Sequence, residues 1–287
     1  MFDLRYHVWS LAAVFLALVI GILVGVGLSG SGVTKNADLK IAQRDRDKAI
    51  AQRDALKKQR DELRKTESAF SIAYPAVMRD LLRGKRVAVL FVGPVDGGIV
   101  RAIDKTLSDA NAPPPLRMRS IIVPIDSQKL DDTLFSRGAQ FIPYIGDDKV
   151  DLLGRDLAAE FVGGGKTPLW NALGKNLVEE RTGNVRQPAD AVIVVRTAKP
   201  QRGETARFLH GLFSGLSISG APSVGVEQTN ENRSAVPIFK ATGLSSVDDV
   251  DLDTGRAALA LLLAGAEGGQ YGVKGTASAI LPPLPGA

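Results

Sequence analysis

The sequence predicts an α/β protein in which an N-terminal transmembrane helix and a helical, coiled-coil-like stalk precede a three-layer α/β domain with a mostly parallel sheet. Three observations support this architecture. An uncharged apolar run occupies 8–28, a charge-rich segment without Gly or Pro occupies 36–70, and apolar runs alternate with amphipathic ones from residue 86 onward. We therefore divide the chain into a membrane anchor (1–32), a stalk (33–83) and a globular domain (84–287).

The apolar run from Val8 to Leu28 has the length of one membrane-spanning helix. At ~1.5 Å per residue it would be roughly 31 Å long, which matches the hydrocarbon core of a bilayer. The apolar region of a cleaved signal peptide is usually shorter, about 7–15 residues, so we expect an uncleaved, single-pass anchor. Tyr6 and Trp9 lie where interfacial aromatic residues are common. Positive charges slightly favour a cytoplasmic C-terminal side, but their numbers on the two sides are close, so the orientation stays open.

Small residues recur every four positions along this run. That spacing places them on one helix face, where two backbones can approach closely, and it includes a GxxxG pattern. Ala and Gly are frequent in any membrane helix, so one pair would mean little, but five in register predict a face for self-association. This association face consists of Ala13, Ala17, Gly21, Gly25 and Ser29.

The stalk is built almost wholly from good helix formers and repeats the tripeptide QRD three times. One position of each heptad is apolar, whereas the companion core position is mostly charged. This half-formed seam favours a loose parallel dimer, tethered by the membrane helix. A solvated single helix with i,i+4 charge pairs is the alternative. The heptad spine consists of Ala42, Ala49, Leu56, Leu63 and Phe70.

The net charge of the chain comes from the stalk. The whole chain carries a formal charge of +5, and the segment from Lys35 to Lys65 alone has five more Lys and Arg than Asp and Glu. A basic stalk beside a membrane suits anionic lipid headgroups. The stalk lacks the aromatic residues that stack on bases, so we expect no nucleic-acid partner.

Residues 71–83, interrupted by Pro75, lead into the globular domain. Its strands are apolar throughout rather than at every second residue, as in a parallel sheet covered by helices on both faces. The expected strands are 86–93, 119–125, 190–198 and 222–229, and the expected helices are 99–111, 148–162, 168–180, 203–217 and 254–265.

The turn GPVDGG (93–98) follows the first expected strand. Ligands of doubly wound sheets bind at the carboxyl ends of strands, and a helix N-terminus suits an anion. Gly93, Asp96, Gly97 and Gly98 are therefore a candidate ligand turn for a phosphorylated compound. The turn lacks the G-x-G-x-x-G spacing, and a tight turn without a ligand is the alternative reading.

Other catalytic patterns are incomplete, so we expect neither an enzyme nor a cofactor. The chain has no Cys, which excludes disulfides, thiolate metal sites and cysteine nucleophiles. GGGKT (163–167) lacks the first Gly of a phosphate loop, and GLSIS (215–219) ends in Ser where a nucleophile elbow needs Gly. Of the two histidines, His7 lies at the membrane interface and His210 is expected to be a hydrogen-bonded helix residue.

Four aspartates gather near residue 250, namely Asp248, Asp249, Asp251 and Asp253. Their spacing does not match an EF-hand loop. We expect a polar edge with Asp253 capping the following helix, and a hard-cation site is the alternative. Ligands for soft metals are scattered along the chain, so no metal site is assigned.

The opening FDLRYHVWSLAAVFLALVIGILVG, followed by the charged stalk, resembles the mycobacterial copper transport protein B (MctB) family. YGVK (271–274) and ILPP (280–283) are similar to the C-terminal pattern of that family. The resemblance implies an envelope protein of copper transport or copper homeostasis with an extracytoplasmic C-terminal domain, described as an outer-membrane efflux component.

Copper ion is thus a candidate partner, although the resemblance supplies no copper-binding residues. One apolar helix makes no pore by itself, so transport would require a homo-oligomer. The alternative function is a membrane-anchored envelope scaffold or interaction protein without direct copper binding.

Overall fold

The computed structural model describes residues 14–22, 24 and 33–283. Contacts between residues divide the chain into two compact units, Met1–Glu62 and Leu63–Ala287. Residues 14–22 and 24 are helical, and the rest of the predicted span 8–28 lies outside the described residues. No helix within the described ranges is both long and apolar enough to cross a bilayer.

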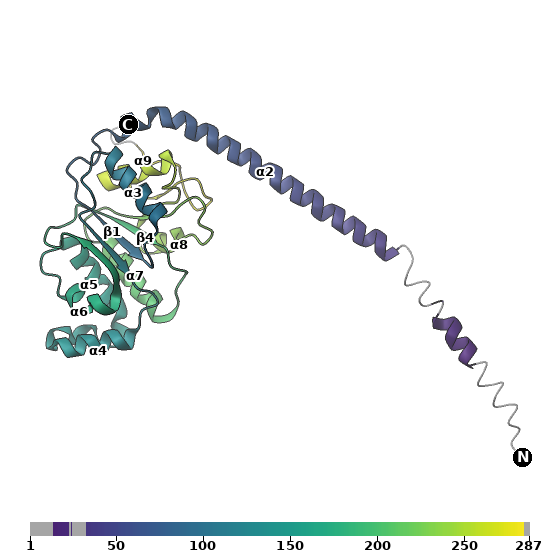
Figure 1. The fold of residues 1–287 in the computed structure, drawn as a ribbon, viewed down its shortest axis with the longest axis horizontal. Helices are drawn as coiled ribbons and strands as arrows, with labels where there is room; N and C mark the ends of the chain where they lie inside the picture. Colours follow the sequence, from purple (N-terminus) through teal and green to yellow (C-terminus); the bar gives the residue numbers. More distant parts are fainter. Residues whose placement is uncertain (1–13, 23, 25–32, 284–287) are drawn as a thin grey trace, which may run out of the picture. The chain divides into compact units, whose positions relative to one another are not determined.

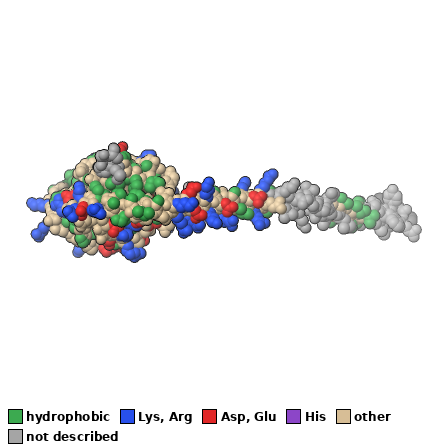
Figure 2. Space-filling model, turned by 90° about the horizontal axis from the view of Figure 1, so that it is seen from above, with side chains coloured by type: hydrophobic (Ala, Val, Ile, Leu, Met, Phe, Trp, Pro, Cys, Tyr) green, Lys and Arg blue, Asp and Glu red, His purple; other side chains and the backbone are tan. Residues whose placement is uncertain are grey.

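The stalk forms one continuous helix, α2 (Val33–Met78). Pro75, which divides the apolar stretch 71–83 in the sequence, lies inside this helix, and the helix continues for three residues beyond it. Proline removes one backbone donor and crowds the carbonyl four residues earlier. Here that loss falls within the last turns of the helix. Figure 2 shows Lys and Arg side chains alternating with Asp and Glu along the described stalk, as the composition predicts.

The globular unit is built around a seven-stranded sheet in the order β3-β2-β1-β4-β5-β6-β7. All neighbouring strands are parallel except β2 and β3, which confirms the predicted mostly parallel sheet. The strands are β1 (Val87–Val92), β2 (Arg117–Ile121), β3 (Val178–Gly183), β4 (Ala191–Arg196), β5 (Ser223–Val226), β6 (Ser245–Val247) and β7 (Gln270–Tyr271).

Helices cover both faces of the sheet, giving three layers (Figure 1). The helices are α3 (Gly97–Asp109), α4 (Ser127–Arg137), α5 (Val150–Gly163), α6 (Pro168–Leu177), α7 (Gly203–Ser217), α8 (Val236–Ala241) and α9 (Asp253–Ala264), with 3-10 turns at η1 (Ala139–Tyr144) and η2 (Asp147–Lys149). One core cluster lies beneath α4 to α8, and the other lies beneath α3, α9 and the end of α2. Successive residues of β1 enter opposite clusters, which is why its sequence is apolar throughout.

The predicted helix 168–180 is too long. It ends at Leu177, and the next residues form β3, which pairs antiparallel with β2. The amide of Ile122, next to β2, donates to the carbonyl of Leu177 at 2.9 Å. This bond stabilises the transition from α6 to β3. Tertiary pairing here overrides local helix propensity. Helices α4 and α8 and the short strands β6 and β7 were not predicted.

The strand order reverses between β1 and β4, because the chain builds outward from β1 in one direction and from β4 in the other. At such a switch point the carboxyl ends of the strands border a crevice between diverging loops. The turns after β1, β4, β5 and β6 therefore share one edge of the sheet. The end of α2 packs near the last of these turns, and the two together form the site described next.

Candidate functional site

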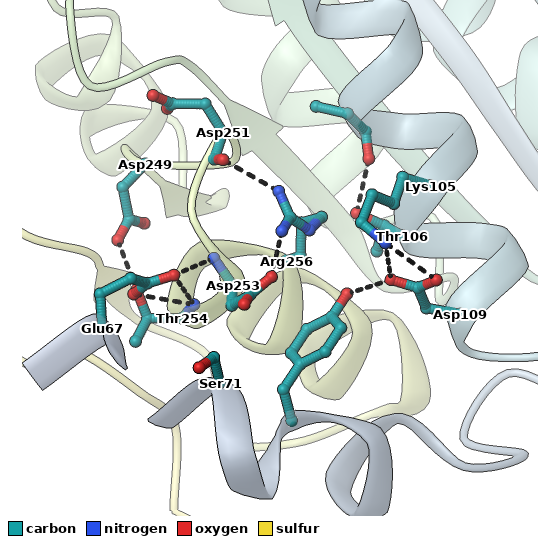
Figure 3. A network of polar contacts seen from close by, with 12 residues as sticks. Glu67, Ser71, Lys105, Thr106, Asp109, Asp249, Asp251, Asp253, Thr254 and Arg256 are labelled. Atoms are coloured by element: carbon teal, nitrogen blue, oxygen red, sulfur yellow. Dashed lines mark hydrogen bonds and ion pairs between the residues drawn. The ribbon is translucent and has the colours of Figure 1, made fainter. Parts of the chain in front are cut away.

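The end of the stalk helix caps another helix of the globular unit. Glu67 Oε1 accepts hydrogen bonds from the backbone amides of Asp253 and Thr254, the first two residues of α9 (Figure 3). A carboxylate at a helix N-terminus satisfies unpaired amides and interacts favourably with the helix dipole. Glu67 thereby supplies, from α2, the cap that α9 lacks in its own sequence.

The prediction that Asp253 caps α9 is wrong. The cap position is Leu252, whose side chain has no hydrogen-bonding atom. Asp253 is instead the first helical residue and forms an ion pair with Arg256. The expected polar edge is also only partly exposed, because Asp248 and Asp249 are fully buried.

The hydroxyl of Thr254 lies between two carboxyl groups (Figure 3). Its Oγ1 is 2.9 Å from Glu67 Oε2 and 3.3 Å from Asp249 Oδ2. A hydroxyl carries one hydrogen and can donate only once. While Asp249 is ionised, the single Thr254 hydrogen is shared between the two carboxylates, whereas a protonated Asp249 donates a second hydrogen bond to Thr254 Oγ1. The geometry therefore favours a chain of donors from Asp249 through Thr254 to Glu67.

The electrostatics of Asp249 agree with this proton. Burial, followed by the neighbouring charge of Asp248, raises the pKa of Asp249 from 3.8 to about 7. Its other oxygen, Oδ1, has no hydrogen-bond partner among the described residues. Burial also raises the pKa of Asp248, although two backbone amides oppose that effect.

Aromatic contacts secure the same end of α2. The Tyr74 hydroxyl donates to Asp109 Oδ2 of α3 at 2.7 Å, and the guanidinium of Arg256 lies 5.6 Å from the centre of the Tyr74 ring. Burial and the bond to Asp109 both raise the pKa of Tyr74. Tyr74, Met78 and Leu82 are buried in the core cluster that contains one face of β1. We call this set of contacts between the end of α2, α3 and α9 the stalk junction.

Asp248 links the stalk junction to the C-terminal segment. Its Oδ1 accepts hydrogen bonds from the amides of Val273 at 2.9 Å and Lys274 at 3.3 Å. Gly272 has φ +134°, and a Cβ at this position would overlap Asp248 Oδ1. Only glycine adopts this positive φ without strain and has no Cβ to overlap the carboxylate. The YGVK segment is therefore fitted closely around one buried carboxylate.

Lys274 extends this network to the carboxyl end of β5. Its Nζ donates to Glu227 Oε1 at 2.8 Å and to the carbonyl of Gln228 at 2.6 Å. Glu227 is buried, and it also accepts hydrogen bonds from the Ser234 hydroxyl and the Ala235 amide. A buried ion pair with its remaining lone pairs satisfied has the geometry that offsets the cost of desolvation. Polar contacts thus run from Glu67, past the two aspartates, to Glu227 at the switch-point edge.

The candidate ligand turn lies at the same edge. Gly93 has φ +101°, and a Cβ there would be 2.7 Å from the amide of Ala198. Asp96 Oδ1 accepts the amide of Ile99 at 2.9 Å and so caps α3 from within the turn. Gly97 and Gly98 are the first residues of α3. The contacts account for the residue types of a tight turn, and ligand binding at this position stays a prediction.

The membrane and stalk residues are placed as follows. Ala13, Gly25 and Ser29 of the association face lie outside the described residues, whereas Ala17 and Gly21 are helical and exposed. In the heptad spine, Ala42, Ala49 and Leu56 are exposed, with Leu56 at 65%, whereas Leu63 is half-buried. Phe70 is half-buried against the core cluster beneath α3 and α9. The last residue of the spine therefore belongs to the stalk junction.

Within 14–22, 24 and 33–283, no group of three or more His, Asp or Glu side chains has a geometry that could hold a metal ion. His210 Nδ1 lies 3.0 Å from Asp151 Oδ1 on the surface of α7, which confirms the expected hydrogen-bonded helix histidine. No metal-ligating role is therefore assigned to a described residue.

Comparison with known proteins matches almost the whole chain. A family model described as "Copper transport outer membrane protein, MctB" matches residues 1–282. Proteins named copper transporter MctB from Mycobacterium bovis and Mycobacterium tuberculosis are 29% identical to this chain over 313 residues. Each alignment covers 95% of this chain and 96% of the relative. The similarity thus extends over the N-terminal segment, the stalk and the globular unit together.

Proposed function

This chain belongs to the MctB family of copper transport outer membrane proteins, and from that premise we propose that it acts in copper transport or copper homeostasis at the cell envelope. The observation that carries the proposal is the full-length match, which includes the YGVK segment. The structure gives this segment a specific task, since the amides of Val273 and Lys274 donate to the buried Asp248 and the Lys274 ammonium group binds the buried Glu227. Copper would be the cargo of such a protein rather than a resident metal.

We further propose that residues 8–28 anchor the chain as a single membrane helix, with the globular unit on the extracytoplasmic side. The uncharged length of this run supports the anchor. An extracytoplasmic side is supported by the family description, which names an outer membrane protein. The basic stalk next to the anchor suits anionic headgroups.

Self-association is the part of the proposal that allows transport. A single apolar helix cannot enclose a water-filled path, so several copies would have to surround one. Exposed small residues at Ala17 and Gly21 and the exposed spine residues Ala49 and Leu56 support pairing of the helices.

Envelope scaffolding is the second candidate function. Phe135 of α4 and Ile142 of η1 are large apolar side chains with exposed fractions of 75% and 58%. A contiguous patch of exposed apolar residues marks a protein-binding surface, and α4 and η1, which carry these two side chains, are in contact with each other. A scaffold would use them to hold an envelope partner, and it would not require copper to pass through the assembly.

Deleting the gene in its host and measuring cell-associated copper tests the proposed function. A copper transport role predicts increased copper content and reduced copper tolerance, both restored by the full-length chain. Unchanged copper content and tolerance would reject that role. Stable recovery of envelope proteins after crosslinking, in cells whose copper content is unchanged, would support the scaffold instead.

The same strain tests self-association. We expect the double variant Ala17→Leu, Gly21→Leu to reduce crosslinked oligomers and to restore copper tolerance poorly, because two large side chains keep the helices apart. Val19→Leu is the matched control, since residue 19 lies about 200° around the helix from residue 17. Equal oligomer yields from both variants would contradict the proposed association face.

A further inference from the structure

Two arginines of β2 are buried without a carboxylate partner. The exposed fractions of Arg117 and Arg119 are 1% and 3%. They are two residues apart on one strand, so both face the core cluster beneath α5 and α6. None of the ion pairs within the described residues includes either of them. Buried charges are normally paired, so this pair requires an explanation.

Arg117 has a structural explanation. Its guanidinium donates to the carbonyls of Val185 and Gln187 and lies 5.9 Å from the centre of the Phe161 ring. These contacts hold the loop after β3 against α5. The positive charge itself is not neutralised by them, because carbonyls and an aromatic ring carry no net charge.

Arg119 is incompletely satisfied. Only its Nη1 forms hydrogen bonds in the described structure, to the carbonyls of Met118 at 3.0 Å and Thr182 at 3.3 Å. The Nε and Nη2 donors of this planar, five-donor group bond no protein acceptor there and keep access to solvent, whereas Nε of Arg117 is fully buried without a partner. Burial, followed by the charges of Arg181 and Arg117, lowers the pKa of Arg119 to about 10. The side chain is therefore still charged at neutral pH.

A third arginine completes the arrangement at the surface. Arg181 of β3 lies directly opposite Arg119 in the antiparallel register, so the two side chains are on the same face of the sheet. Like charges directly opposite each other are destabilising. Asp190, just before β4, does not offset them, because both of its oxygens bind Arg86. Arg181 is exposed and so connects the buried charge to solvent.

We propose that Arg119 and Arg181 bind a small free oxyanion, namely inorganic phosphate or a phosphate monoester. Guanidinium groups present paired N–H donors that match two oxygens of a phosphate. An anion between the two side chains removes their repulsion and accepts from the unsatisfied donors of Arg119. A lipid headgroup carries the same chemistry, but the 3% exposure of Arg119 favours a small ligand that can enter beside Arg181.

Thermal unfolding of the full-length protein in phosphate, against chloride at equal ionic strength, tests the site. We expect millimolar phosphate to raise the wild-type Tm, and Arg181→Gln to weaken the apparent phosphate affinity by about 10-fold, the loss of one charge-assisted contact. Arg186→Gln is the matched control, because Arg186 is exposed in the adjacent loop, and we expect it to retain wild-type affinity. No phosphate-dependent rise in Tm, or an equal loss in both variants, would overturn the proposal.

Arg119→Met keeps the test independent of folding defects. Replacing an uncompensated buried charge with an apolar chain of similar length is neutral or stabilising. We therefore expect this variant to be at least as stable as the wild type in chloride and to gain nothing from phosphate. A large loss of stability in chloride would show that the charge is already compensated within the protein, which contradicts the proposal. Binding to phosphatidic acid vesicles without any response to free phosphate would overturn the choice of ligand.

Discussion

Replacing Asp249 with Asn tests whether a proton holds the stalk junction together. Asn has nearly the shape of Asp, and its amide donates to Thr254 at any pH, whereas the carboxyl group can donate only while protonated. The wild-type pKa of Asp249 is raised from 3.8 to about 7 by burial and by Asp248. The variant therefore keeps the donor and removes the titration.

The raised pKa determines the sign of the expected pH dependence. Between pH 3.8 and about pH 7 the folded protein binds the Asp249 proton more tightly than the unfolded chain does. The free energy of unfolding consequently falls as the pH rises through this window. The stabilising effect of the proton is complete below the lower value and is lost as the pH passes the upper one.

The size of the expected change in the free energy of unfolding follows from the same range of pH. One pH unit corresponds to about 1.4 kcal/mol. From about pH 5 to pH 8 the protein crosses about two units of the window, so we expect the wild type to lose roughly 3 kcal/mol relative to Asp249→Asn. The two proteins should be most alike in stability below about pH 4, and the advantage of the variant should grow by this amount between about pH 5 and pH 8.

Urea unfolding at several pH values, followed by the fluorescence of buried Trp170, measures this difference. Other buried carboxyl groups, including Glu160, also have raised pKa values, but they are common to both proteins and cancel in the comparison. Asp104→Asn, at an exposed position on α3, serves as a control that should retain the wild-type pH dependence. Parallel stability curves for the wild type and Asp249→Asn would refute the protonated junction.

Three further substitutions test the neighbouring contacts, each by equilibrium unfolding at neutral pH. Thr254→Val removes the hydroxyl shared by two carboxyl groups, and we expect a loss of about 1–3 kcal/mol. Gly272→Ala places a Cβ against Asp248 at a positive φ and should cost more than about 2 kcal/mol, whereas Gly275→Ala, with open space around its Cβ, should cost little. Lys274→Met leaves Glu227 buried without its partner and should cost about 3–5 kcal/mol. Adding Glu227→Gln should recover part of that loss, and independent, additive effects would argue against the ion pair.

The strands of the central sheet were predictable because each is long, apolar and bounded by turn residues. The expected strands 86–93 and 190–198 contain β1 and β4, whose residues are buried on both faces. Burial on both faces leaves little choice of residue type, so the sequence carries a strong signal there. The helices at 203–217 and 254–265 are also close to α7 and α9.

Edge strands gave no such signal. The β3 sequence, VEERTG, is polar and mostly exposed, and it becomes a strand only because β2 offers it a register. Charged residues at a sheet edge protect against pairing with other chains. The residues of an edge strand are therefore polar, and they lack the apolar pattern by which a strand is predicted. Two buried arginines on β2 likewise contradict the usual pattern of a central strand, and one of them, Arg119, belongs to the proposed oxyanion site.

The stalk junction could not be found from local sequence, because its parts are distant along the chain. Glu67 occupies a companion heptad position in the sequence pattern, where a charged residue counts against a coiled-coil seam. In the structure it is the cap of α9, 186 residues away. The heptad pattern and the capping contact compete for the same turns of α2, and Phe70 and Tyr74 show that packing against the core prevails there.

These contacts change how the C-terminal segment relates to the stalk. Val273 and Lys274 satisfy Asp248, Asp248 raises the pKa of its neighbour Asp249, and Asp249 shares the hydroxyl of Thr254 with Glu67. The protonation states and hydrogen bonds of these groups are coupled, so neutralising or displacing one of them changes the electrostatic environment of its neighbour. Loss of residues 271–283 should therefore weaken the capping of α9 by Glu67, even though no hydrogen bond within the described structure joins that segment to Glu67. A family pattern at the end of the chain and a charged residue in the stalk are thus parts of one electrostatic assembly.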